Sequence, residues 1–149
     1  MSNLFIIAHA PLASAFQALA AHAFPDEVVA LRAFDVPAGA DVDGYLAEAE
    51  RLLDSLPAGD VLLLTDVFGA TPCNIARRLA EQRGLRVLVG INVPMLWRAI
   101  NYRHKPLDEL TMLAMAGASQ GVLQLTATRP QNQVQKPPSH DPHLGNHQQ

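Results

Sequence analysis

The chain has 149 residues, of which 49% are hydrophobic and 17% charged, and its formal net charge is −3. This composition is typical of a globular protein with a substantial core, and the lack of clustered basic residues argues against nucleic acid as a partner. A single cysteine, Cys73, excludes an intrachain disulfide, and no apolar run is long enough to span a membrane. We therefore expect a cytoplasmic protein without membrane insertion.

Apolar runs and helical spacing alternate along the chain. In chain order we expect a strand at 4–8, a helix at 12–24, a strand at 28–34, a helix from 41 or 43 to 56, a strand at 61–65, a helix from 71 to about 84, a strand at 86–91, helices at 92–100 and 106–118, and a last short strand at 122–126. Asp41 or Asp43, Thr71 and Asn92 are the expected N-caps, with Pro72 in the first helical position.

Strands that alternate with helices over short connections indicate an α/β fold. We expect an open, doubly wound parallel sheet of order about 2-1-3-4, with helices on both faces. Residues 1–128 would form this single domain. Residues 129–149 contain many Gln, Pro, Asn and His and almost nothing apolar, so we expect a disordered polar tail there.

Two polar side chains follow buried strands in this scheme, His9 after the first strand and Asp66 after the third. Ligands of open parallel sheets bind beyond the carboxyl ends of the strands, where the strand order reverses. If the two strands are neighbours, their backbones lie about 5 Å apart. The imidazole and the carboxylate would then be within hydrogen-bonding reach.

A histidine held by a carboxylate has a specific chemical use. The carboxylate accepts a proton from one ring nitrogen and leaves the lone pair of the other nitrogen free as a nucleophile. The turn of Gly69, Ala70 and Thr71 opens a helix, and the first helix after His9 starts at the same edge, so free N–H groups would favour a phosphoryl group there. The sequence thus predicts a nucleophile, its orienting partner and an anion-binding turn.

Plainer interpretations exist for each of these residues. His9 and Asp66 are common turn residues, and Phe68 is either a core residue or, in a turn beside the site, a docking surface for a partner. Cys73 is most simply a small buried residue. The tail histidines His140, His143 and His147 offer at most weak metal binding, and we expect neither a metal nor a cofactor in the site.

Three segments resemble sequence blocks of the mannose-family enzyme IIA of the sugar phosphotransferase system (PTS). They are 6–10 (IIAHA), 64–74 (LTDVFGATPCN) and 89–96 (VGINVPML), in the family's order and each with a strand before or within it. The resemblance implies a phosphotransferase that carries a phosphoryl group on His9, with Asp66 as its hydrogen-bond partner. Thr71 stands where the family usually has serine.

The resemblance also implies the partners. The donor would be the histidine-containing phosphocarrier protein and the acceptor a IIB domain. Family members form homodimers in which a C-terminal strand, here 122–126, pairs across the interface.

The chain departs from the family pattern at four positions. Glycines are usual where this chain has Ala10 and Ala70, Cys73 replaces the usual residue, and Pro11 lacks an N–H. These changes leave the identity of the phosphoryl acceptor open. The alternative is a regulatory protein in which the phosphorylation state of His9 controls partner binding without sugar transport.

Two other phosphoryl-transfer classes fit less well. A response-regulator receiver requires acidic residues at the end of the first strand, where this chain has His9. A cysteine phosphatase requires an arginine six residues after its cysteine, and that position after Cys73 is Leu79.

Overall fold

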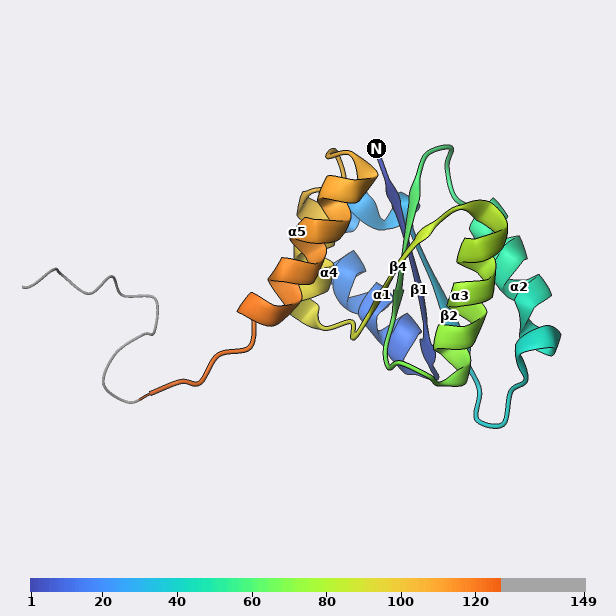
Figure 1. Ribbon diagram of the computed structural model, residues 1–149. Coiled ribbons are helices and arrows are strands. Elements are labelled where there is room, and N and C mark those ends of the chain that lie inside the picture. Colours follow the sequence, from blue (N-terminus) through green and yellow to red (C-terminus); the bar gives the residue numbers. More distant parts are fainter. Residues whose placement is uncertain (127–149) are drawn as a thin grey trace, which may run out of the picture.

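Four parallel strands form the sheet of the protein, shown in Figure 1 as a computed structural model in which residues 1–126 are described. The strands are β1 (Asn3–His9), β2 (Leu31–Val36), β3 (Val61–Thr65) and β4 (Arg86–Val89). Their order across the sheet is β2-β1-β3-β4, with every neighbouring pair parallel. The predicted order 2-1-3-4 is confirmed, and the carboxyl ends of β1 and β3 lie side by side.

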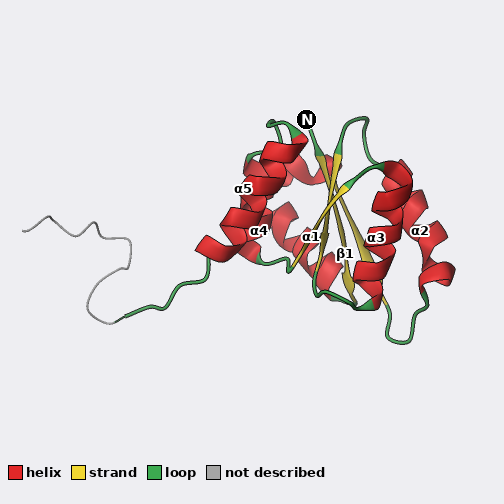
Figure 2. Ribbon diagram, in the orientation of Figure 1, coloured by secondary structure: helices red, strands yellow, loops and turns green. Residues whose placement is uncertain are grey.

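Helices cover both faces of the sheet, as predicted. The helical elements are α1 (Leu12–Ala23), the 3₁₀ helix η1 (Pro25–Ala30), α2 (Val42–Asp54), α3 (Thr71–Arg83), α4 (Val93–Asn101) and α5 (Leu107–Gln120). In Figure 2, α1, α4 and α5 lie on one side of the strands, and α2 and α3 on the other. None of the helices within residues 1–126 is long and apolar enough to cross a membrane.

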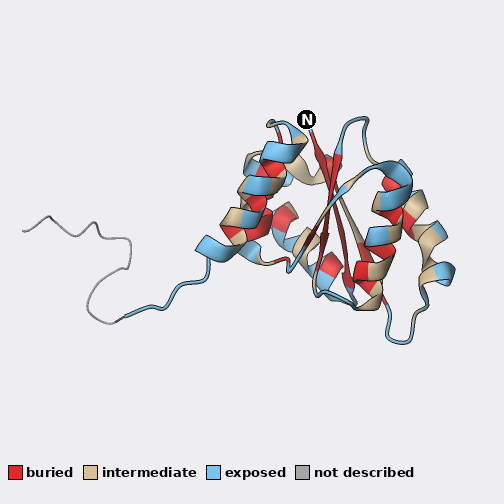
Figure 3. Ribbon diagram, in the orientation of Figure 1, coloured by how far each residue is buried: buried red, intermediate tan, exposed pale blue. Residues whose placement is uncertain are grey.

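Alternate residues of β1 belong to two separate cores. Leu4 and Ile6 pack beneath α1, α4 and α5, whereas Phe5 and Ile7 pack beneath α2 and α3. Both faces of the strand are therefore buried (Figure 3), which explains its continuous apolar run. Burying one such side chain stabilises the fold by about 1.5–3 kcal/mol, so the central strands hold the tips of β1 and β3 in fixed positions.

Several expected boundaries shift in the structure. Residues 28–34 were predicted as one strand, but Pro25 opens a 3₁₀ turn that continues to Ala30, and β2 begins only at Leu31. The fourth strand ends at Val89 rather than 91, because Gly90 turns the backbone at a φ of +93°.

The helix caps are confirmed at two of the three predicted positions. The carboxylate of Asp41 accepts a hydrogen bond from the Gly44 N–H at 2.6 Å, and the Asn92 side chain accepts one from Met95 at 2.8 Å. Thr71 is not the N-cap of α3. The N–H of Asn74 donates to the carbonyl of Ala70 at 3.0 Å, so the helix begins one residue earlier than expected and Ala70 is the cap.

The segment that follows α5 forms no strand in the single chain. Residues 122–126 have no regular secondary structure and, in Figure 1, leave the end of α5 on the side away from the sheet. A strand needs a neighbouring strand for its N–H and C=O groups. Within residues 1–126 the sheet consists of β1 to β4 and does not include this segment. Its pairing across a dimer stays a prediction. The predicted polar tail 129–149, with its three histidines, lies outside the described residues.

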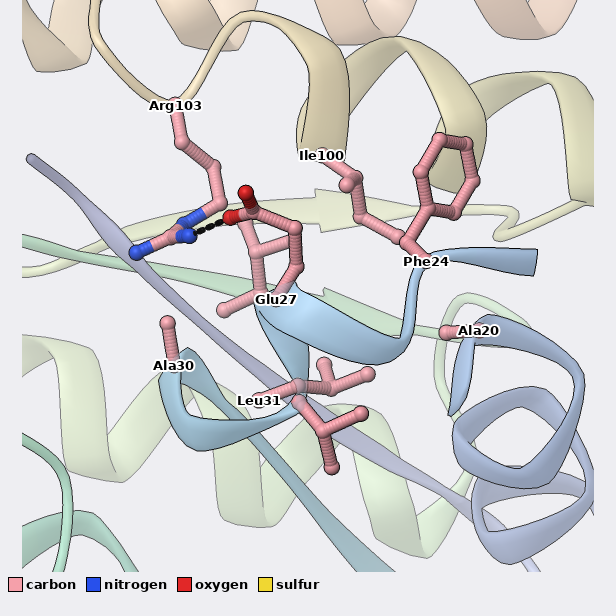
Figure 4. A pocket seen from close by; sticks show the side chains of 9 residues that line it. Ala20, Phe24, Glu27, Ala30, Leu31, Ile100 and Arg103 are labelled. Carbon is pink, nitrogen blue, oxygen red and sulfur yellow. Dashed lines mark hydrogen bonds and ion pairs between the residues drawn. The ribbon is translucent and has the colours of Figure 1, made fainter. Parts of the chain in front are cut away.

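Arg103 closes the end of the sheet opposite His9. Its side chain is only 10% exposed, forms an ion pair with Glu27, and donates from Nε to the carbonyl of Ser2 at 2.7 Å. Figure 4 shows the pair beside a small pocket lined by Ala20, Phe24, Ala30, Leu31 and Ile100. A buried arginine is costly without a partner, and the pairing with Glu27 joins the turn after α4 to η1. The bond to Ser2 joins the same turn to the start of β1.

Candidate functional site

The tips of β1 and β3 bring one imidazole and one carboxylate into contact. His9 is the last residue of β1, and Asp66 directly follows β3. The Nδ1 atom of His9 lies 2.6 Å from Oδ2 of Asp66, across 57 positions of sequence. Parallel pairing of Ile7 with Thr65 creates this contact, because it places the residues after both strands at the same edge. The juxtaposition expected from the sequence is present in the structure.

Asp66 is held by hydrogen bonds on both carboxylate oxygens. Its Oδ2 atom accepts a second bond from the backbone N–H of His9 at 3.0 Å, and its Oδ1 atom accepts one from the Val67 N–H at 2.9 Å. The hydroxyl of Thr65, a fully buried residue, lies 3.5 Å from Oδ1, at the long limit of such a bond. The carboxylate therefore has one defined orientation, with an oxygen directed at the His9 ring.

The pKa of Asp66 lies below its usual value of 3.8. Burial alone would raise this pKa, but the hydrogen bonds from the His9 backbone, the His9 ring and the Val67 backbone outweigh it. The side chain is ionised at neutral pH as a result. Since an ionised carboxylate can only accept, the proton of the 2.6 Å contact belongs to Nδ1 of His9.

This proton assignment sets the chemistry of the second ring nitrogen. In a neutral imidazole with a proton on Nδ1, Nε2 keeps its lone pair. The His9 side chain is 49% exposed, whereas that of Asp66 is 11% exposed. The site thus pairs a half-exposed imidazole, whose Nε2 lone pair could act as a nucleophile, with a mostly buried carboxylate that orients the ring.

The turn after Asp66 carries the remaining predicted residues. Gly69 has a φ of +82°, a conformation that favours glycine, and it leads through Ala70 into the first residue of α3, Thr71. The first N–H groups of a helix have no partner within the helix, and Pro72 removes one of them here. Phe68, at the outer side of the turn, is 84% exposed and is not a core residue.

The helix that follows His9 has fewer free N–H groups at its N-terminus than expected. Its N-cap is Pro11, which has no N–H, and the N–H of Ser14 donates to the carboxylate of Asp35 at 3.0 Å. Asp35 was missed because the second strand was expected to end at residue 34. Asp35 pairs with Ala8 at the same sheet edge as His9. The sequence could have indicated it, because a carboxylate directly after the expected end of a strand is a candidate site residue.

The other candidate residues lie apart from the site or are buried. Cys73 is a free, buried cysteine, as expected. His22 lies in the last turn of α1, and His104 borders an open pocket at the opposite end of the sheet, beside Met1 and Asp60. Within residues 1–126, no group of three or more His, Cys, Asp or Glu side chains could hold a metal ion.

Several solved structures with the same fold are components of a phosphotransferase system. A mannose/sorbose-specific IIA subunit of the phosphotransferase system from Enterococcus faecalis has a TM-score of 0.76 and 22% identity, over 87% of this chain and 98% of its own. The phosphotransferase system component EIIA from Streptococcus agalactiae has a TM-score of 0.74 and 21% identity, over 83% of this chain and 97% of its own. At these identities the likeness shows the fold.

A PTS IIA protein associated with the fucose utilization operon of Streptococcus pneumoniae is similar as well, with a TM-score of 0.59 and 21% identity over 83% of this chain and 92% of its own. No curated protein sequence matches this chain. The model of a protein family, EIIA-man, described as the PTS system fructose IIA component, matches residues 3–114. This match covers β1 through most of α5 and includes both His9 and Asp66. The chain therefore belongs to the EIIA-man family of phosphotransferase-system IIA components.

Proposed function

We propose that this protein is a phosphohistidine carrier of the phosphoenolpyruvate-dependent sugar phosphotransferase system, with His9 as the phosphorylated residue. Membership of the family places it among the components of a phosphoryl-transfer chain. The observation that carries the residue-level proposal is the 2.6 Å contact between His9 Nδ1 and an Asp66 carboxylate whose pKa is lowered. The proposed donor is the histidine-containing phosphocarrier protein, and the proposed acceptor is a IIB domain.

The transfer step forms one nitrogen–phosphorus bond and breaks another. The lone pair of His9 Nε2 attacks the phosphorus of the donor's phosphohistidine, and the electron pair of the breaking bond returns to the donor's ring nitrogen. The His9 ring becomes positively charged while its Nδ1 proton stays hydrogen-bonded to Asp66, which stabilises that charge. Transfer to the acceptor repeats this displacement, with Nε2 of His9 as the leaving atom.

The start of α3 is the proposed binding site for the oxygens of the phosphoryl group. The positive end of a helix dipole favours an anion by about 0.3–1 kcal/mol at an exposed position. Gly69 and Ala70 lack bulky side chains that would obstruct the approach. The Thr71 hydroxyl is not used as the helix cap, so it can donate to a phosphoryl oxygen.

Phosphorylation in a reconstituted system tests the proposal. Incubation with labelled phosphoenolpyruvate and the two general phosphotransferase proteins should label the chain with an acid-labile, base-stable group. His9→Ala should abolish the labelling, whereas His22→Ala, which alters a histidine at the far end of α1, should leave it unchanged. Labelling that persists in His9→Ala would refute the assignment.

Transfer onward separates a carrier from a regulator. A carrier releases its phosphoryl group rapidly to a IIB domain and thereby serves sugar uptake. Stable phosphorylation with no IIB acceptor, together with a partner that binds only one phosphorylation state, would instead favour the regulatory function. In either case the proposed location of this chemistry is the cytoplasm.

A further inference from the structure

Asp35 is a second carboxylate at the sheet edge that carries His9. It is the second-last residue of β2, where it pairs with Ala8 while Val36 pairs with His9. Neighbouring strands lie about 4.8 Å apart, so the backbones of Asp35 and His9 are little more than one strand spacing from each other. Asp66 reaches the same histidine from β3, the strand on the other side of β1. The strand that ends in His9 thus has a carboxylate near the tip of each neighbour.

The side chain of Asp35 caps α1 from outside the helix. An N-cap residue commonly accepts a hydrogen bond from the third helical N–H with a side-chain oxygen, but Pro11 at this position makes no such bond. The third helical residue is Ser14, and its N–H donates to Oδ1 of Asp35 at 3.0 Å. The strand β2 thereby supplies the acceptor that Pro11 lacks. The carboxylate lies at the positive end of the α1 dipole, where a bound anion would otherwise be favoured.

Asp35 and the proposed phosphoryl site face different helices. Side chains alternate along a strand, and Phe34 and Val36 belong to the core under α2 and α3. Asp35 therefore projects toward α1, in agreement with its bond to Ser14. The start of α3, the proposed site for the phosphoryl oxygens, belongs to a helix on the other face of the sheet (Figure 2). An influence of Asp35 on that group is electrostatic and requires no contact.

Phosphorylation makes the site more negative by about one charge. A phosphoryl group on Nε2 of His9 brings about two negative charges, and the ring that carries it gains one positive charge. A fixed carboxylate within a Debye length, about 10 Å at moderate salt, disfavours the added negative charge. Asp35 also occupies the N–H of Ser14, which would otherwise attract a phosphoryl oxygen. Both effects favour release of the phosphoryl group over its retention.

We infer that Asp35 is a positioning residue that keeps the phosphoryl group off the N-terminus of α1 and raises its transfer potential, so that phosphorylated His9 passes the group onward more readily. This inference rests on the proposed function. It names the residue that sets how far phosphoryl transfer to the chain proceeds, a property separate from the attack by Nε2. Asp66 stabilises the positive ring, whereas Asp35 limits the stability of the phosphorylated state as a whole.

The equilibrium of phosphoryl transfer with the donor protein tests the inference. Asp35→Asn keeps an oxygen that can accept from the Ser14 N–H but removes the charge. At low salt, the ratio of phosphorylated chain to phosphorylated donor should rise about threefold over that of the wild type, and by less at high salt. Both phosphoproteins are quantified after equilibration of labelled donor with each variant. Asp35→Glu, which keeps the charge, should stay close to the wild-type ratio.

Controls separate the charge of Asp35 from its role as a cap. Asp26→Asn makes the same charge change at an exposed position of η1, before β2 and so at the opposite end of that strand, and should leave the ratio unchanged. Asp35→Ala removes both charge and cap, so it should raise the ratio and also lower the unfolding temperature. Asp35→Asn should unfold near the wild-type temperature. Asp35→Thr, also uncharged and able to accept, replaces it if the asparagine variant does not fold.

The contrary results are distinguishable. An unchanged ratio in folded Asp35→Asn would overturn the inference, and so would a ratio that falls or an equal rise in Asp26→Asn. A slower reaction that reaches the wild-type ratio would overturn it as well, because it would place Asp35 in the rate of transfer alone. The proposed function fails separately, if the wild-type protein takes up no phosphoryl group or if His9→Ala still does.

Discussion

The two carboxylate oxygens of Asp66 have different tasks at the tip of β3. Oδ1 accepts from the following backbone N–H, which fixes the side chain, and Oδ2 accepts from both the backbone and the ring of His9. A side chain fixed on one oxygen can orient a histidine with the other at little further cost in conformational entropy. The imidazole is thus already oriented before any partner arrives.

Neutralising this carboxylate should affect the chemistry more than the fold. Asp66→Asn keeps the size of the side chain but removes the charge that we propose stabilises the ring as it attacks phosphorus. We expect phosphorylation of His9 to slow on the order of 100-fold or more. Stopped-flow or rapid-quench measurement of labelling would show this.

Asp60→Asn is the matched control for that experiment, since Asp60 precedes β3 at the opposite end of the sheet. It should phosphorylate at the wild-type rate. A circular dichroism spectrum and an unfolding curve of each variant would establish that both remain folded. A wild-type rate in folded Asp66→Asn would contradict the role assigned to the carboxylate.

At the scale of elements, the site depends on where α3 begins. Thr71 is the first residue of the helix and not its cap, because the backbone of Ala70 is extended and its carbonyl accepts the first helical hydrogen bond. The hydroxyl is therefore left for a ligand. At the N-terminus of α1, Pro11 has no N–H and the N–H of Ser14 already donates to Asp35, so fewer groups are left for a ligand. The N-termini of α1 and α3 therefore differ in the groups that they leave free for a ligand.

The same two helices show how far the sequence could predict the site. The buried runs of β1 and β3 are long enough to identify both strands, and their parallel pairing then determines the contact of His9 with Asp66. The start of α3 depends on one backbone dihedral at Ala70, which residue type alone does not determine. Asp35 depends on the register of β2, and the 3₁₀ turn at Pro25 shifted that strand by several residues.

Arg103 illustrates a second limit. In the sequence it belongs to a basic turn, Arg103-His104-Lys105, and such turns are usually exposed. The structure buries it against Glu27, which lies 76 positions away in the chain. A pairing over this distance follows from the packing of α4 against the sheet, so a local pattern cannot reveal it.

At the scale of the whole molecule, the sheet has an open edge. β4 pairs with β3 on one side and ends the described sheet on the other. The segment 122–126 after α5 carries Val122, Leu123 and Leu125 in exposed positions. Unpaired edges and exposed apolar segments favour association, and the family resemblance predicts that this segment pairs with a second copy.

Truncation separates this segment from the tail that follows it. We expect the full chain to sediment as a dimer, removal of residues 122–149 to give a monomer, and removal of residues 127–149 alone to leave the dimer intact. Analytical ultracentrifugation over a range of concentrations measures all three. A monomeric full chain, or a dimer that survives the longer truncation, would show that the segment does not mediate dimerisation.

The central claim is that Asp66 holds Nδ1 of His9 and leaves Nε2 to react. The most direct measurement is an NMR spectrum of the phosphorylated, nitrogen-15-labelled protein, in which coupling to phosphorus identifies the nitrogen that carries the phosphoryl group. The structure predicts phosphorus on Nε2 of His9, with a proton retained on Nδ1. Phosphorus on Nδ1, or on any residue other than His9, would contradict the account.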